Sequence, residues 1–87
     1  MSPEQFRLTR EANPFRPFII HMADGRSYSV PHRDFCSQSP AGYRTILVFH
    51  PEGEGAFSIV DLNLVTELEV PALPATPEPP APGENGG

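Results

Sequence analysis

Residues 18–30 read FIIHMADGRSYSV, and this stretch determines the fold class. Apolar and other side chains alternate along its first five residues, so a strand with one buried face is predicted there. The side chains on that face are Phe18, Ile20 and Met22. Asp24-Gly25 follows, and Asp-Gly between two alternating segments is a strong signal for a β-hairpin. Residues 26–30 then form the returning strand, with Tyr28 and Val30 facing inward.

The chain beyond residue 30 continues as short strands separated by turns. Pro31 interrupts the second strand because proline has no amide hydrogen to donate, and a bend at residues 32–34 follows. Extended structure is predicted at residues 35–38, 44–50, 56–61 and 65–70. Turns are predicted at residues 39–42 and 51–55, and a short helical turn at 61–64. Phe57 and Ile59 share one face of their strand, and Leu68 and Val70 point inward in the last one.

The N-terminus carries the signature of a helix start. Ser2 can cap the first free amides, Pro3 suits the first helical position, and Gln5 completes a capping box. The helix is predicted to run to about residue 11, and Asn13-Pro14 ends it. So short a helix is not stable alone in water, so it must lie on the rest of the domain or on a partner.

The predicted fold is therefore mainly β: a small SH3/Sm-like antiparallel five-stranded barrel with a short N-terminal helix. Residues 1–13 form the helical segment, and residues 14–70 form the barrel. Residues 71–87 are rich in Pro, Ala and Gly and are predicted to be a disordered Pro-rich tail. The tail also contains overlapping P-x-x-P steps, which favour a polyproline II segment able to dock in an aromatic groove.

The charge of the chain is unevenly distributed. The net charge is −5, yet all six arginines lie in residues 1–50 and residues 51–87 carry only acids. This balance disfavours a general nucleic-acid binder. Arg7, Arg10, Arg16 and Arg33 are the candidate contacts to an anion or RNA. The alternative for the helix is a solvated face, on which Glu4 and Glu11 are local partners of Arg7.

No segment is predicted to cross a membrane, because the longest apolar run is residues 46–49. Cys36 is the only cysteine, and a lone thiol fits a reducing compartment. The N-terminus lacks a basic-then-apolar signal pattern. A cytoplasmic location is therefore predicted.

Candidate chemistry is sparse. His32, Asp34 and Cys36 alternate along an extended segment, which places them in a row and does not aim a base at the thiol. His21, His32, His50 and Cys36 lack zinc-site spacing. No phosphate-binding glycine motif occurs. The prediction is a protein that is not an enzyme, with no cofactor, no metal and no small-molecule substrate.

Four short patterns point to a resemblance. They are Arg16-Pro17-Phe18, Asp24-Gly25-Arg26, Ser58-Ile59-Val60-Asp61 and Val65-Thr66-Glu67-Leu68. Together they resemble a group of small uncharacterised bacterial proteins over about residues 3–70, a group that implies no activity. The element order is more loosely similar to the Sm/Hfq-like barrel, whose members often form RNA-binding rings. Where Hfq-type proteins have a Lys-His pair, residues 61–64 read DLNL, so no RNA-contact residue is carried over.

The function predicted from the sequence is a non-catalytic small-barrel binding or assembly module. A core this small is marginal, and the charge polarity favours a homo-oligomer in which the basic half of one copy meets the acidic half of another. The alternative is an Sm-like RNA-binding protein.

Overall fold

The computed structural model describes residues 1–40 and 43–72. Most of the predicted tail, residues 73–87, lies outside this part. One helix precedes six short strands: α1 (Pro3–Arg10), β1 (Phe18–Met22), β2 (Ser27–Val30), β3 (Cys36–Gln38), β4 (Thr45–Phe49), β5 (Phe57–Asp61) and β6 (Val65–Glu69). Two 3-10 turns, η1 (Arg33–Phe35) and η2 (Leu62–Leu64), precede β3 and β6. The described ranges contain no helix long and apolar enough to cross a membrane.

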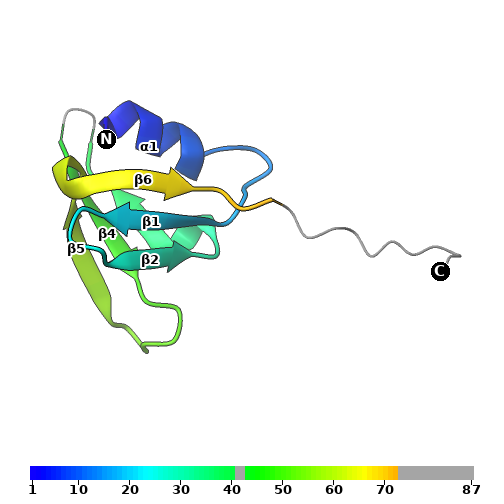
Figure 1. The fold of residues 1–87 in the computed structure, drawn as a ribbon. Coiled ribbons are helices and arrows are strands. Elements are labelled where there is room, and N and C mark those ends of the chain that lie inside the picture. Colours follow the sequence, from blue (N-terminus) through cyan, green and yellow to red (C-terminus); the bar gives the residue numbers. More distant parts are fainter. Residues whose placement is uncertain (41–42, 73–87) are drawn as a thin grey trace, which may run out of the picture.

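The strands form two three-stranded antiparallel sheets, in the orders β2-β1-β6 and β3-β4-β5. The second sheet lies behind the first in Figure 1, and α1 lies above them. The fold is thus mainly β with a short N-terminal helix, as predicted. The sequence predicted five strands with a bend in the second. The structure instead places the two halves of that strand, β2 and β3, in different sheets, because η1 turns the chain between them.

The inner faces of both sheets and one side of α1 enclose a single core. Its buried members are Phe6, Phe18, Ile20, Val30, Cys36, Ile46, Val48, Val60, Leu62 and Val65. Met22, Tyr28 and Leu68 pack against this core, which confirms their predicted inward orientation. Val70 was predicted to point inward but is exposed, because β6 ends at Glu69 and the chain leaves the sheet there.

Local signals account for the ends of several elements. Ser2 and Gln5 form the predicted capping box at the start of α1. Gly25 has a φ of 93° in the β1–β2 turn, a left-handed conformation that favours glycine. Asp61 accepts a hydrogen bond from the Asn63 amide and so caps η2. The predicted capping box, β-hairpin and helical turn are thus confirmed.

Candidate functional site

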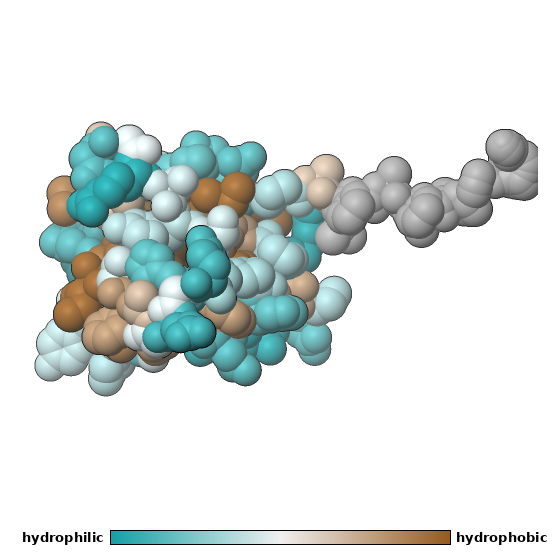
Figure 2. Space-filling model, turned by 90° about the horizontal axis from the view of Figure 1, so that it is seen from below, coloured by the Kyte–Doolittle hydropathy of each residue, from teal (hydrophilic) through white to brown (hydrophobic). Residues whose placement is uncertain are grey.

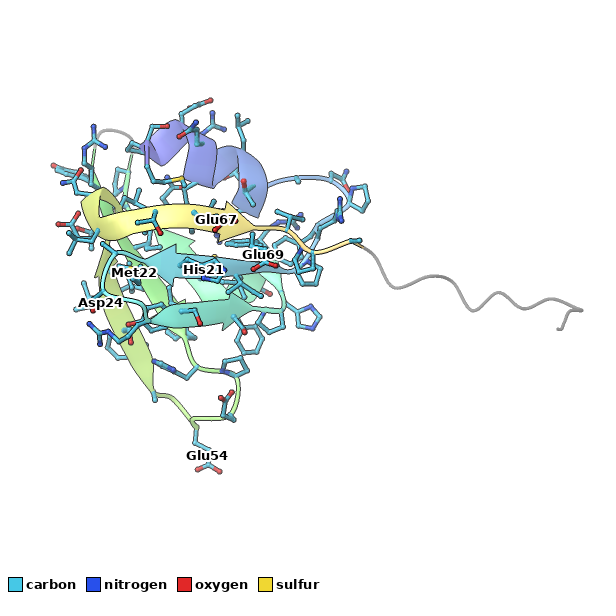
Figure 3. All side chains as sticks on the ribbon, in the orientation of Figure 1. His21, Met22, Asp24, Glu54, Glu67 and Glu69 are labelled. Carbon is cyan, nitrogen blue, oxygen red and sulfur yellow. The ribbon has the colours of Figure 1, made fainter. Side chains whose placement is uncertain are left out.

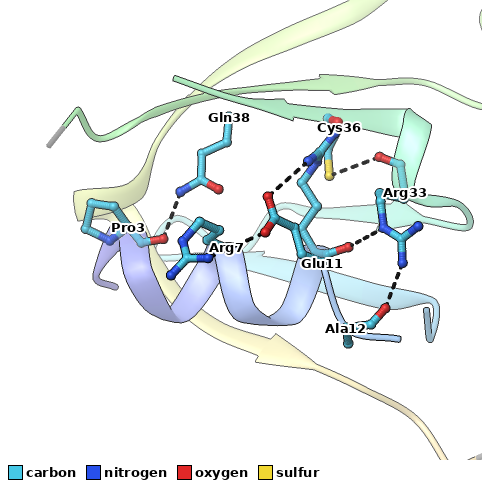
Figure 4. A network of polar contacts seen from close by, with 8 residues as sticks. Pro3, Arg7, Glu11, Ala12, Arg33, Cys36 and Gln38 are labelled. Carbon is cyan, nitrogen blue, oxygen red and sulfur yellow. Dashed lines mark hydrogen bonds and ion pairs between the residues drawn. The ribbon is translucent and has the colours of Figure 1, made fainter. Parts of the chain in front are cut away.

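Arginines fasten α1 to the rest of the molecule (Figure 4). Arg10 Nε donates to the Cys36 carbonyl oxygen at 3.0 Å. Arg33 donates from Nε to the Arg10 carbonyl at 2.9 Å and from Nη2 to the Ala12 carbonyl at 2.7 Å. The Arg10 and Ala12 carbonyls lie at the C-terminal end of α1 and just beyond it. Carbonyl groups at a helix C-terminus lack partners within the helix. Arg10 and Arg33 therefore hold the helix against β3.

The other two predicted contact residues are also engaged within the chain. Arg7 forms ion pairs with Glu4 and Glu11 on the surface of α1, the alternative that the helical spacing indicated. Arg16 Nη2 donates to the Pro71 carbonyl at 2.6 Å. The structure thus places all four candidate arginines in contacts with their own chain.

The four arginines do not converge on one surface. Arg7 and Arg10 line a groove between α1 and the chain after β3. A third arginine, Arg44, lines the same groove, and it was not among the residues predicted from the sequence. Glu4 and Glu11 line the same groove, so carboxylates already balance much of its positive charge. Arg16 lies at a separate cavity beside Leu8 and Val70.

The Cys36 thiol is unsuited to nucleophilic chemistry. Cys36 is buried, and burial raises the pKa of its thiol, an effect that the nearby Arg10 only partly opposes. A raised pKa keeps the thiol protonated, and the thiolate is the nucleophilic form. His32 and Asp34 are both exposed. In the described ranges, no three His, Cys, Asp or Glu side chains lie where they could hold a metal ion together.

The outer face of the β3-β4-β5 sheet carries an apolar cluster that the sequence reading did not identify as a site. We call it the β5 apolar face, and its members are Leu47, Phe49, Phe57 and Ile59. Cross-strand pairing sets Leu47 opposite Ile59 and Phe49 opposite Phe57, and the two phenyl rings lie 6.0 Å apart. Ile59 is 70% exposed and Phe57 is 52% exposed. Apolar surface gathers at the end of the molecule where β5 lies (Figure 2).

β5 carries larger apolar side chains on its outer face than on its inner face. Its inward side chains are Ser58 and Val60, whereas its outward ones include Phe57 and Ile59. The inward hydroxyl of Ser58 is satisfied by His50 Nε2 at 2.9 Å. Apolar side chains that gather on an exposed surface are typical of interaction sites.

The outer face of the other sheet provides a contrast. His21, Glu67 and Glu69 lie together there on β1 and β6 (Figure 3). His21 Nε2 lies 2.8 Å from a Glu69 carboxylate oxygen. Ser27 and Ser29 complete this face on β2. Apart from Ile19, which lies between Ser29 and Glu69, this sheet has the polar outer face expected of an antiparallel sheet in water, so it lacks an apolar cluster like that of β4 and β5.

β5 also has a free backbone edge, because β4 is its only strand neighbour in the described part of the chain. The His50 amide donates to the Ala56 carbonyl, and the Leu62 amide donates to the Arg44 carbonyl. In an antiparallel pair every second residue bonds to the same neighbour. Ser58 and Val60 therefore bond to β4, and the remaining residues direct their N–H and C=O groups to the free edge. Those residues are Phe57, Ile59 and Asp61.

The four residues of the β5 apolar face could be found in the sequence only as apolar positions of two predicted strands. Both faces of β5 contain apolar residues, so the alternation alone does not show which face is buried. Comparisons with known proteins do not supply the missing information: no family model, no curated protein and no solved structure matches the chain.

Proposed function

We propose that this protein is a non-catalytic assembly module that associates with itself through the β5 apolar face. The observation that carries the proposal is the exposure of Ile59 and Phe57 beside Leu47 and Phe49 on two paired strands. Burying the exposed part of Ile59 or Phe57 contributes about 1–2 kcal/mol each, from the area that would leave water. Association itself costs about 4–15 kcal/mol, so a weak, concentration-dependent assembly is expected.

Charge favours a protein partner for this surface over RNA. Glu52, Glu54 and Asp61 border the β5 apolar face, and residues 45–61 contain no arginine or lysine. Glu54 lies at the tip of the β4–β5 loop (Figure 3). An acidic border repels phosphate groups. RNA binding through Arg7, Arg10, Arg16 and Arg33 has less support, because each of them already donates to an acceptor in its own chain.

The proposal includes an SH3/Sm-like barrel that is open at the edge of β5, in which the two sheets pack around one core. Two observations support it: η1 carries the chain from β2 into β3, and η2 carries it from β5 into β6. The sheets are thus linked at two corners around a shared core. We also propose a cytoplasmic location, since Cys36 is the one cysteine and stays a buried free thiol.

Sedimentation equilibrium over about a hundredfold range of concentration tests the proposal, since mass action makes self-association depend on concentration. The wild type is compared with Ile59→Ser, and Leu64→Ser is the matched control because Leu64 is also exposed but lies in η2. We expect the mass of the wild type and the control to rise with concentration and that of Ile59→Ser to stay monomeric.

Low and high salt form two arms of the same experiment. An apolar contact persists at high salt, whereas a contact between the basic and acidic halves of two copies weakens. A wild type that is monomeric in both arms would refute self-association. A salt-sensitive assembly that Ile59→Ser leaves intact would refute the β5 apolar face as the contact.

A further inference from the structure

The four strand edges of the two sheets differ in how they are protected. Just after β3, the Ser39 amide donates to the Thr45 carbonyl oxygen. Because only every second residue bonds to β4, Ser37 and Ser39 face β4 and Cys36 directs its backbone groups to the free edge. Its carbonyl oxygen there accepts a hydrogen bond from Arg10 of α1. The helix thus occupies the edge of β3.

The edges of β6 and β2 are protected in other ways. Leu8 and Thr9 of α1 line one cavity together with Val70, so the helix lies beside the end of β6 (Figure 1). β2 is only four residues long, its edge positions are Ser27 and Ser29, and Pro31 follows it. Short strands, polar side chains and proline are the usual devices that keep an edge from pairing.

In the described part of the chain, the edge of β5 has only one of these devices, the charged side chain of Asp61 at its end. It is five residues long, it contains no proline, and Asp61 is its only charged residue. An exposed apolar edge of this kind is a template for another strand. Its free backbone groups belong to residues 57, 59 and 61, which are evenly spaced about Ile59.

We infer that β5 pairs with β5 of a second copy, antiparallel and about a two-fold axis at Ile59; this inference rests on the proposed self-association. In that register Ile59 faces Ile59 of the other copy, and Phe57 faces Asp61 of the other copy. Every free N–H and C=O of the three edge residues then gains a partner, because the same residues supply donors and acceptors on both strands. The two sheets join into one, and the two β5 apolar faces become continuous.

Pairing of β5 with β6 of a second copy is the competing arrangement. It would bring Asp61 toward strand β6, which carries Glu67 and Glu69, and like charges on neighbouring strands are unfavourable. It would also have to use the edge beside α1. The symmetric pairing avoids both difficulties and uses one surface twice, as a two-fold interface does.

The test uses the fact that residue 59 faces residue 59 of the other copy only in the symmetric register. Ile59→Lys and Ile59→Glu are prepared separately and then mixed in equal amounts. Ile59 is exposed on the outer face, so neither change disturbs the core, and far-UV circular dichroism checks that both variants fold. Each variant alone places like charges opposite each other, which should weaken its association about tenfold or more. The mixture places Lys opposite Glu and should recover dimers that contain one copy of each variant.

The outcomes separate this inference from the function on which it rests. If both variants lose association and the mixture stays monomeric, the symmetric register is wrong while the β5 apolar face remains the contact. If both variants associate as the wild type does, the proposed function fails at this surface. If mixed dimers form, the same charge pair introduced at Leu64 should leave wild-type association unchanged. If Leu64→Lys and Leu64→Glu also lost association alone and recovered it when mixed, the inference would be overturned.

Discussion

Phe6→Ala should remove most of the stability of this domain. Phe6 is the only buried side chain of α1 and is completely inaccessible to solvent. It packs edge-on against Phe18, with ring centroids 5.9 Å apart and an angle of 81° between the ring planes. Truncating a buried Phe to Ala costs about 3–5 kcal/mol through lost burial and the cavity left behind. A domain of about 70 residues has a free energy of unfolding of only about 4–10 kcal/mol.

Urea unfolding followed by far-UV circular dichroism measures this cost. Leu8→Ala is the control, because Leu8 lies on the same helix and is 58% exposed, so its change should stay within about 0.5 kcal/mol. The thermal midpoint of Phe6→Ala should fall by at least about 10 °C, given a shift of about 4–8 °C per kcal/mol at this size. A loss below about 1 kcal/mol, or one equal to that of Leu8→Ala, would show that α1 is not part of the cooperative core.

Three further predictions concern local features. Ser2→Ala should lower the free energy of unfolding by about 1 kcal/mol because it removes the capping box, and a loss near zero in urea unfolding would contradict that role. Gly25→Ala should cost about 1 kcal/mol through its φ of 93°, whereas Gly25→Asn should cost less in the same assay. Burial raises the pKa of the Cys36 thiol in the folded state, so the unfolded state loses that proton first as the pH rises. The free energy of unfolding should therefore fall above the unfolded pKa of the thiol, and Cys36→Ala should lack this part of the slope.

Much of the fold follows from signals that act over a few residues. The capping box at Ser2, the Asp24-Gly25 turn and the helical turn before the last strand each depend on local hydrogen bonds or on one glycine. Such features form in the same way whatever the rest of the chain does, so the sequence predicts them well. The inward faces of β1 and β2 were also predictable, because only one face of the β1–β2 hairpin is consistently apolar.

β5 could not be oriented in this way. Val60 and Ile59 are adjacent and similar in size, so the alternation allows either face to be buried. On the inner side, Ser58 is hydrogen-bonded to His50, which directly follows β4. That contact joins two segments of the chain, so it is not visible in the residue pattern of β5 alone. The candidate surface therefore emerged from tertiary contacts.

The partners of the arginines could not be predicted from the sequence either. Their clustering in the first half of the chain indicated an anion-binding surface, yet the structure directs Arg10, Arg16 and Arg33 to backbone carbonyl oxygens. A guanidinium suits this role because its several donors lie in a rigid plane. The acids of the second half have few bases near them in sequence, and three of them, Glu52, Glu54 and Asp61, lie on β5 or in the loop before it.

One arginine connects stability and assembly. Arg10 anchors the C-terminal half of α1 and occupies the edge of β3 with the same side chain. One sheet thus has a β3 edge that its own helix blocks and a β5 edge that stays available. An association through β5 alone is closed after two copies if it is two-fold, because the opposite edge cannot extend the sheet further. Loss of the Arg10 contact would free the Cys36 carbonyl at that edge while Arg33 still holds the helix, so Arg10→Ala should add a fraction of larger assemblies in sedimentation equilibrium, and Arg10→Lys should add less.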